Sequence, residues 1–108
     1  MVKAGDVVVV DYPGVSGSKT RPAIVVSSDL YNSERPDIIL GLVTSQLHQA
    51  KDSTDYILED WKKAGLHSRS AFRAFLSTIP ASQATIIGRL SDRDWQEIQL
   101  KLKLAIAF

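Results

Sequence analysis

The sequence predicts a single, mainly β domain, a small barrel of short strands with one C-terminal helix. Three observations support this fold class. The chain has 108 residues, of which 44% are hydrophobic, and this composition supplies one core for one domain over residues 1–108. Glycine, proline and small polar residues interrupt the sequence about every eight to twelve residues, a spacing typical of short strands in β-rich folds. Residues 91–108 instead repeat apolar side chains at helical spacing.

The first two strands are predicted at residues 6–12 and 21–28. The first contains four consecutive valines, and a continuous β-branched run is typical of a central strand that is buried on both faces. Residues 13–19 contain one proline and two glycines, so we expect a loop there. Pro22 fits near the start of the second strand, where a missing N–H is tolerated.

Four further strands are expected, at residues 38–46, 53–59, 70–79 and 84–90. The segment SDLYNSERPD before the first of these is interpreted as a polar excursion between strands. The segment DWKKAGL, residues 60–66, is interpreted as one or two helical turns. Asp60 is its expected N-cap and Gly65 its expected stop.

The C-terminal helix begins with a capping signal. Ser91 is followed three residues later by Asp94, which is a capping-box pattern with the shorter acid. An apolar face follows at helical spacing, made of Trp95, Ile98, Leu102, Ala105 and Ile106. Leu100, Leu104 and Phe108 widen that face beyond one stripe. The surplus belongs either to the core or to a contact with a second chain, and it leads us to expect a homodimer.

Composition excludes several classes of protein. The net charge is only +1, so any contact with nucleic acid depends on local positive charge and not on a large field. The chain has no cysteine, which excludes disulfides, thiolate metal sites and a thiol nucleophile and fits a reducing cytoplasm. The N-terminus lacks the apolar region of a signal peptide, and no run approaches the roughly 18 apolar residues of a membrane span. We therefore expect a cytoplasmic protein that does not bind membranes.

Two basic residues lie at the start of the second predicted strand. In SGSKTRPAIVV, the residues Lys19 and Arg21 lie between a glycine-serine loop and a strongly apolar strand. Arg21 is either a solvated residue at a strand end or a side chain that binds an anion. The second alternative is chemically reasonable because a planar guanidinium binds phosphate through two parallel hydrogen bonds. In the second case the strand fixes the arginine, and the loop closes over the bound substrate.

A second polar group ends the strand at residues 38–46. If that strand runs on through Leu47, Thr44, Gln46 and His48 share one face and Ser45 points to the other. His48 is then a candidate for proton transfer, because its ordinary pKa lies near neutrality. The alternatives are an ordinary β-branched residue at Thr44 and a surface loop histidine at position 48.

The remaining basic candidates lie near residues 67–75. His67 is interpreted as a surface residue that follows the helical turn. Alternation puts Arg69, Arg73 and Phe75 on one face of a strand, and basic groups beside an exposed aromatic suit single-stranded RNA. The alternative is a half-solvated strand with Phe75 in a dimer contact. No spacing of histidines and acids matches a metal-ligand set, so we expect neither a metal nor a cofactor.

Several motifs together resemble a known family. GDVVVVDYP, KTRPAIVVSSDLYN, VTSQ, WKKAGL and IGRLS before a C-terminal helix are similar, in order and spacing, to the PemK/MazF toxins of bacterial toxin–antitoxin modules. The resemblance covers nearly the whole chain. It implies an SH3-like β-barrel with helices (the CcdB/PemK-like fold), a homodimer and a cognate antitoxin that occupies the active groove. It also implies a growth-arresting, metal-independent and sequence-selective endoribonuclease that cleaves single-stranded mRNA.

The resemblance assigns residues by position. Arg21 matches the catalytic arginine of the family and Thr44 its catalytic threonine. Lys19 and Gln46 lie beside them in the sequence, and we expect both to contact the substrate. Arg73 matches an arginine that an acid often follows, and Phe75 stands where that acid is frequent. The resemblance therefore assigns no general acid or base to this strand, and no acid is expected beside Arg73.

The assigned residues suit RNA cleavage by the ribose 2′-OH. That reaction gathers negative charge on the phosphoryl oxygens, which an arginine stabilises, and a threonine hydroxyl adds a hydrogen-bond donor. Two other functions stay open at this point: a toxin of the same fold that poisons DNA gyrase, and a barrel that binds RNA or protein without cutting. Incubation with a long single-stranded RNA in excess EDTA distinguishes all three.

Overall fold

The structure of the protein is a computed structural model that describes residues 1–14 and 17–108, with side chains for residues 1–11 and 20–108. The strands of this part are β1 (Asp6–Gly14), β2 (Gly17–Val25), β3 (Asp37–Thr44), β4 (Tyr56–Ile57), β5 (Ala71–Pro80) and β6 (Ala84–Arg89). The α-helices are α1 (Asp29–Glu34) and α2 (Asp92–Ala105), and short 3₁₀ turns are η1 (Leu47–Gln49) and η2 (Ala81–Gln83).

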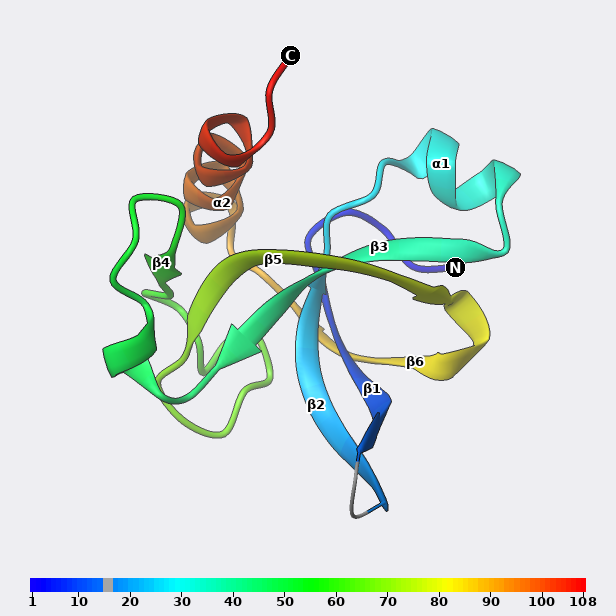
Figure 1. Ribbon diagram of the computed structural model, residues 1–108, viewed down its shortest axis with the longest axis horizontal. Coiled ribbons are helices and arrows are strands. Elements are labelled where there is room, and N and C mark those ends of the chain that lie inside the picture. Colours follow the sequence, from blue (N-terminus) through cyan, green and yellow to red (C-terminus); the bar gives the residue numbers. More distant parts are fainter. Residues whose placement is uncertain (15–16) are drawn as a thin grey trace.

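These strands form one antiparallel sheet in the spatial order β4-β5-β3-β2-β1-β6. Figure 1 shows that the sheet curls strongly and that α2 lies against it near β4 and β5. The predicted fold class, mainly β with a C-terminal helix, is confirmed. The sheet is open, because β4 and β6 are its edges and do not pair with each other.

The central strands are buried on both faces, as the valine run predicts. Val7 of β1 and Ile24 of β2 belong to one core cluster, which also contains Ile98 of α2. Their neighbours Val8 and Ala23 belong to a second cluster. Since successive side chains of a strand point to opposite faces, the two clusters pack on opposite sides of the β1–β2 pair.

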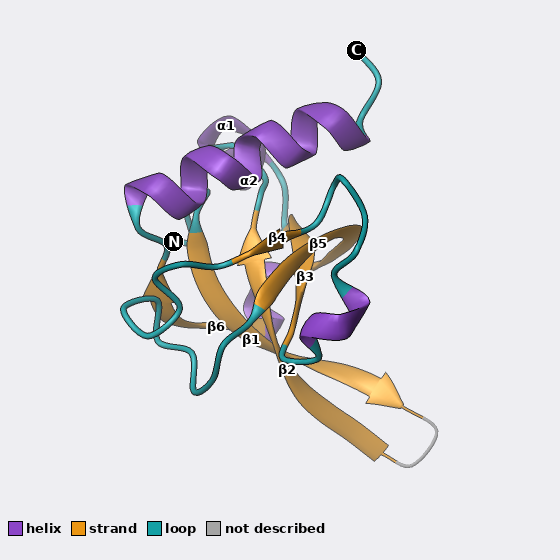
Figure 2. Cartoon of the chain, turned by 90° about the vertical axis from the view of Figure 1, so that its left-hand side faces the viewer, coloured by secondary structure: helices purple, strands orange, loops and turns teal. Residues whose placement is uncertain are grey.

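The β1–β2 pairing extends further than expected. Cross-strand partners continue from Val7 and Ile24 to Gly14 and Gly17, and Figure 2 shows the two strands running out beyond the rest of the sheet. The predicted loop at residues 13–19 is therefore wrong at its outer positions, because backbone pairing continues through Pro13 and reaches Gly14 and Gly17. Residues 15–16 lie outside the described residues.

The pairing of β3 with β5 contains an irregularity. Gly41 pairs with Leu76, whereas the next residue, Leu42, pairs with Arg73. Two residues of β5, Ala74 and Phe75, therefore have no counterpart on β3, as in a bulge. The expected alternation along residues 69–75 breaks at this point.

The predicted start of the C-terminal helix is confirmed. Ser91 is the N-cap of α2, and its Oγ accepts a hydrogen bond from the backbone N–H of Asp94 at 3.3 Å. The Asp94 carboxylate is fully buried and accepts hydrogen bonds from the Tyr56 hydroxyl at 2.6 Å and from the N–H groups of Glu59 and Asp60 at 3.0 and 2.8 Å. One side chain thus ties the helix to the chain that leads out of β4.

Sequence patterning does not predict α1. The polar excursion expected there contains a helix that Ser28 caps, because its Oγ accepts a hydrogen bond from Tyr31 N at 3.1 Å. The buried residue of the helix is Asn32, whose amide donates to the carbonyl of Ser27 at 3.2 Å. A helix held through a polar side chain has no apolar periodicity for sequence reasoning to detect.

β4 is shorter than predicted, and the segment after it is less regular than predicted. The expected strand at residues 53–59 is reduced to Tyr56–Ile57. Residues 61–65 form a turn and not a helix, although Ala64 N donates to Asp60 O at 3.2 Å in the helical pattern. Gly65 has a φ of +87°, so it ends the turn in the left-handed conformation, as predicted. No helix within residues 1–14 and 17–108 is long and apolar enough to cross a membrane.

Candidate functional site

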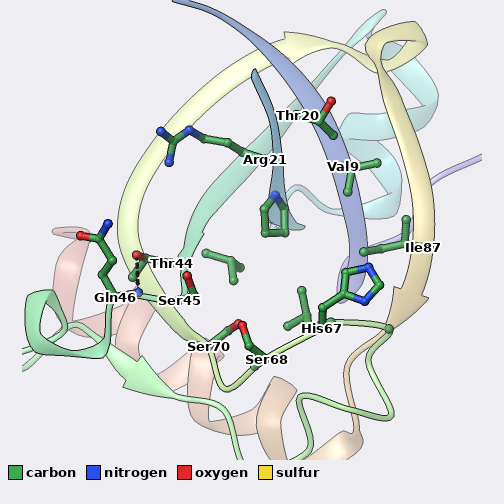
Figure 3. Close-up of a pocket in the computed structure, with 14 residues that line it drawn as sticks. Val9, Thr20, Arg21, Thr44, Ser45, Gln46, His67, Ser68, Ser70 and Ile87 are labelled. Carbon is green, nitrogen blue, oxygen red and sulfur yellow. Dashed lines mark hydrogen bonds between the residues drawn. The ribbon is translucent and has the colours of Figure 1, made fainter. Parts of the chain in front are cut away.

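A cavity of about 810 Å³ lies inside the curl of the sheet. Its lining comes from the middle of β2, the end of β3, β6 and the segment of residues 65–70 that leads into β5 (Figure 3). Arg21 and Thr44 both line it. The structure therefore places in one cavity the two residues that the family resemblance assigns to catalysis, although they come from different strands.

One wall of the cavity is polar. Arg21 is exposed, and the described carboxylates form no ion pair with it. The backbone N–H of Gln46 donates to Thr44 Oγ1 at 3.1 Å, and the side-chain carbonyl of Gln46 accepts from Gln49 Nε2 at 2.7 Å. Figure 3 shows the Arg21 guanidinium, Thr44 and Gln46 on the same side of the cavity. Ser45 also lines the cavity, so the expectation that it points away is wrong.

The strand geometry expected for His48 is also wrong. β3 ends at Thr44, and the chain turns at once, since Leu47 N donates to Ser45 O at 3.1 Å and Gln49 N donates to Gln46 O at 3.0 Å. His48 lies in the resulting 3₁₀ turn, is exposed and does not belong to the cavity lining. The alternation that put Thr44 and His48 on one face requires an extended chain through Leu47.

The opposite wall contains a residue that sequence reasoning missed. His67 lines the cavity together with Leu66 of the same segment and Ile87 of β6, and Figure 3 shows His67 and Ile87 across the cavity from Thr44 and Gln46. Two glycines allow this arrangement. A Cβ at Gly65 would lie 2.4 Å from Ile87 O, and a Cβ at Gly88 would lie 2.1 Å from the carbonyl oxygen of the residue before Gly65.

The sequence contains one indication that residues 64–65 lie against residues 87–88, namely the glycines at positions 65 and 88. WKKAGL and IGRL each supply one of these glycines, and the predicted role of Gly65 as the end of a turn covers only the first. Since glycine is favoured where backbone comes near backbone, pairing the two motifs would have put His67 next to β6.

Arg73 and its neighbours do not reach the cavity. Its guanidinium forms ion pairs with Asp52 at 3.6 Å and with Asp55 at 3.5 Å, so the prediction that no acid lies beside it is wrong. These acids come from a loop distant in sequence, which explains why spacing along the strand did not reveal them. Arg69 and Phe75 are exposed, with Phe75 at 71%, and neither lines the cavity. The Lys19 side chain lies outside the described residues.

A network of side chains anchors the segment that carries His67. Asp60, predicted as a helix N-cap, instead accepts hydrogen bonds from the Arg93 guanidinium at 2.7 Å and from Ser91 Oγ at 2.6 Å. Arg93 and then Ser91 hold the pKa of Asp60 well below its usual range. Burial and the hydrogen bond to Asp94 raise the pKa of the Tyr56 hydroxyl, which stays protonated as the donor.

Comparisons with known proteins agree with this architecture. A family model described as PemK-like, MazF-like toxin of type II toxin–antitoxin system matches residues 3–106. The endoribonuclease EndoA of Bacillus subtilis (strain 168) is 30% identical over 112 residues, covering 99% of this chain and 96% of that protein.

Solved structures share the fold at lower identity. An endoribonuclease in complex with its cognate antitoxin from mycobacterial species has a TM-score of 0.79 at 14% identity, covering 100% of this chain and 99% of that one. A chain of the MazE–MazF complex (form III) from Deinococcus radiodurans has a TM-score of 0.75 at 22% identity, covering 98% of each. Because the family model spans nearly the whole sequence, this chain belongs to the PemK-like, MazF-like toxins of type II toxin–antitoxin systems.

Proposed function

We propose that this toxin is an endoribonuclease that cleaves single-stranded mRNA by attack of a ribose 2′-OH on the adjacent phosphate, without a metal ion. The observation that carries the proposal is the meeting of Arg21 and Thr44 in one open cavity. The relative that is 30% identical along its length is named an endoribonuclease. An RNA substrate of this kind places the reaction in the cytoplasm.

Arg21 has the position and the freedom to hold the reacting phosphate. Its backbone is fixed by pairing with Val10 of β1, while its side chain is exposed on the cavity. A guanidinium fork binds two phosphoryl oxygens at once, and its charge gains strength as negative charge develops on them. Arg21 therefore stabilises the transition state more than the substrate.

Thr44 adds an oriented donor. Its Oγ1 already accepts the N–H of Gln46, so its single hydroxyl hydrogen is available to a phosphoryl oxygen. The Gln46 side-chain carbonyl is occupied by Gln49, which leaves the two amide hydrogens of Gln46 available to the substrate. Arg21, Thr44 and Gln46 therefore each offer hydrogen-bond donors to an anion at the polar wall.

The proposed test measures cleavage of a long single-stranded RNA in excess EDTA. We expect discrete cuts by the wild-type toxin, and losses of about a hundredfold or more for Arg21→Ala and Thr44→Val, because each removes a transition-state donor. Arg69→Ala is the matched control, since it removes an exposed arginine that does not line the cavity. Binding without cutting by the wild-type toxin, or near wild-type cleavage by Arg21→Ala, would overturn the proposal.

We also propose that the toxin acts as a homodimer and is inhibited by a cognate antitoxin. Four large apolar side chains at the C-terminal end, Leu100, Leu104, Ile106 and Phe108, are exposed by 52, 65, 41 and 101%, and a second copy that covers them would remove this surface from water. A carboxylate of an antitoxin at Arg21 would block the phosphate position. Light scattering at tens of micromolar should give a dimer mass, and a monomer mass would contradict the first part.

A further inference from the structure

We propose that the cavity wall formed by His67 and Ile87 is a nucleobase subsite, which binds the base next to the phosphate that Arg21 holds. This inference rests on the proposed function, because it assumes RNA in the cavity. It assigns a role to the one histidine of the cavity lining, and that role is stacking and not proton transfer.

The distribution of charge in the cavity orients a nucleotide. Among the described residues that line it, Arg21 is the one permanently charged side chain, so the phosphate belongs at the polar wall. The other wall offers the imidazole of His67 and the side chain of Ile87, which is 37% exposed. A base whose phosphate lies at Arg21 therefore extends toward the wall that has a ring face and an apolar side chain.

The cavity has room for this arrangement. Its volume of about 810 Å³ falls in the range of pockets that enclose small organic ligands, about 300–1,000 Å³. A single-stranded nucleotide can turn its base out of the stack, and protein side chains such as His then stack on the exposed ring. Ser68 on the same segment is exposed and lines the cavity, and its hydroxyl supplies a hydrogen-bonding group for a base edge.

The wall is held in place before any ligand binds. On one side of His67, Leu66 is 8% exposed and its N–H donates to Trp61 O at 3.2 Å. On the other side, Ser70 is 4% exposed and its Oγ donates to Ser68 O at 2.8 Å. Because the chain is held on both sides of His67, binding a base there requires ordering of the side chain but not of the whole segment, which lowers the entropy cost of stacking.

The test separates stacking from the alternatives by two substitutions at one position. His67→Ala removes the ring, whereas His67→Phe keeps an aromatic face and removes both titratable nitrogens. The probe is a short RNA that contains a mapped cleavage site, with one 2′-deoxynucleotide that prevents cutting. Two further probes carry an abasic nucleotide on the 5′ or the 3′ side of the scissile phosphate. Fluorescence anisotropy gives the Kd of each protein for each probe.

The subsite predicts a specific pattern of affinities. His67→Ala should weaken binding of the complete probe about tenfold, because the variant loses the stacking of one base. For the abasic probe that lacks the stacked base, His67→Ala and the wild-type protein should have nearly the same Kd. His67→Phe should bind the complete probe nearly as wild type and should cleave the all-ribose RNA.

Other outcomes would overturn either the base subsite or the proposed function on which it rests. If His67→Ala binds all three probes as wild type does, or if His67→Phe is as weak as His67→Ala, the wall does not stack a base. If His67→Phe binds normally but no longer cleaves, His67 transfers a proton and the stacking role is wrong. Failure of the wild-type toxin to cut the all-ribose RNA instead refutes the proposed function.

Discussion

Asp94 gives the sharpest test of how the site is held together. Its carboxylate is fully buried at the start of α2, and it binds the Tyr56 hydroxyl and the backbone N–H groups of Glu59 and Asp60. The chain that continues from Asp60 carries the His67 wall of the cavity. Asp94→Ala removes all three acceptor contacts in one change.

The expected cost follows from the number of donors left without a partner. Hydrogen bonds to a charged group contribute about 1.5–3 kcal/mol each. Three of them would sum to about 4.5–9 kcal/mol, but water can reach part of the freed segment, because Glu59 is exposed and Tyr56 is half-buried. We therefore expect Asp94→Ala to lower the free energy of unfolding by about 3–5 kcal/mol, a large share of the roughly 5–15 kcal/mol of a domain.

Guanidinium denaturation followed by tryptophan fluorescence measures this loss. Trp61 and Trp95 both pack against the core cluster that contains Ile98, so their emission reports the contact between α2 and the sheet. Asp92→Ala is the matched control, because Asp92 is an exposed acid in the same first turn and its loss should cost only about 0.3–1 kcal/mol. Equal destabilisation by the two variants would refute the anchoring role of Asp94.

Three other predictions concern the packing, the acid sensitivity and the chemistry. Gly88→Ala puts a Cβ 2.1 Å from Ala64 O, so the backbone must shift, and we expect a loss of about 1–3 kcal/mol in denaturation together with slower RNA cleavage. Arg93 lowers the pKa of Asp60 in the folded state. The ion pair therefore stabilises the fold at pH values above about 3.9, the ordinary pKa of an aspartate, and this stabilisation is lost as the pH falls below that value. Denaturation between pH 5 and 2 should therefore show a steeper loss for wild type than for Arg93→Ala. His48→Ala should cleave RNA within about twofold of the wild-type rate, in contrast to the 10²–10⁴-fold loss that a general acid or base would give.

Sequence reasoning succeeded where the determinants are local. The Ser91 cap and the apolar spacing of α2 are properties of neighbouring residues, so the helix start was predicted correctly. The valine run likewise identified β1 as a strand buried on both faces. The boundaries of strands were less accurate, because pairing partners decide them, as at Gly14 and Gly17.

The site was predictable only in part. Family motifs pointed to Arg21 and Thr44, and the structure brings these two together. The position of His67 depends on the approach of residues 64–65 to residues 87–88, which is a contact between distant parts of the chain. The carboxylates that pair with Arg73 come from residues 52–55, and no pattern along β5 indicates them.

The central claim is that the cavity of Arg21 and Thr44 promotes attack by a ribose 2′-OH. The most direct measurement compares, in excess EDTA, a short RNA that contains a mapped cleavage site with the same RNA carrying one 2′-deoxynucleotide just before the scissile phosphate. We predict that the all-ribose RNA is cut into fragments with a 2′,3′-cyclic phosphate and a 5′-hydroxyl end, and that the substituted bond stays intact. Cleavage of the substituted bond at a comparable rate would show that another nucleophile acts and would contradict the proposed mechanism.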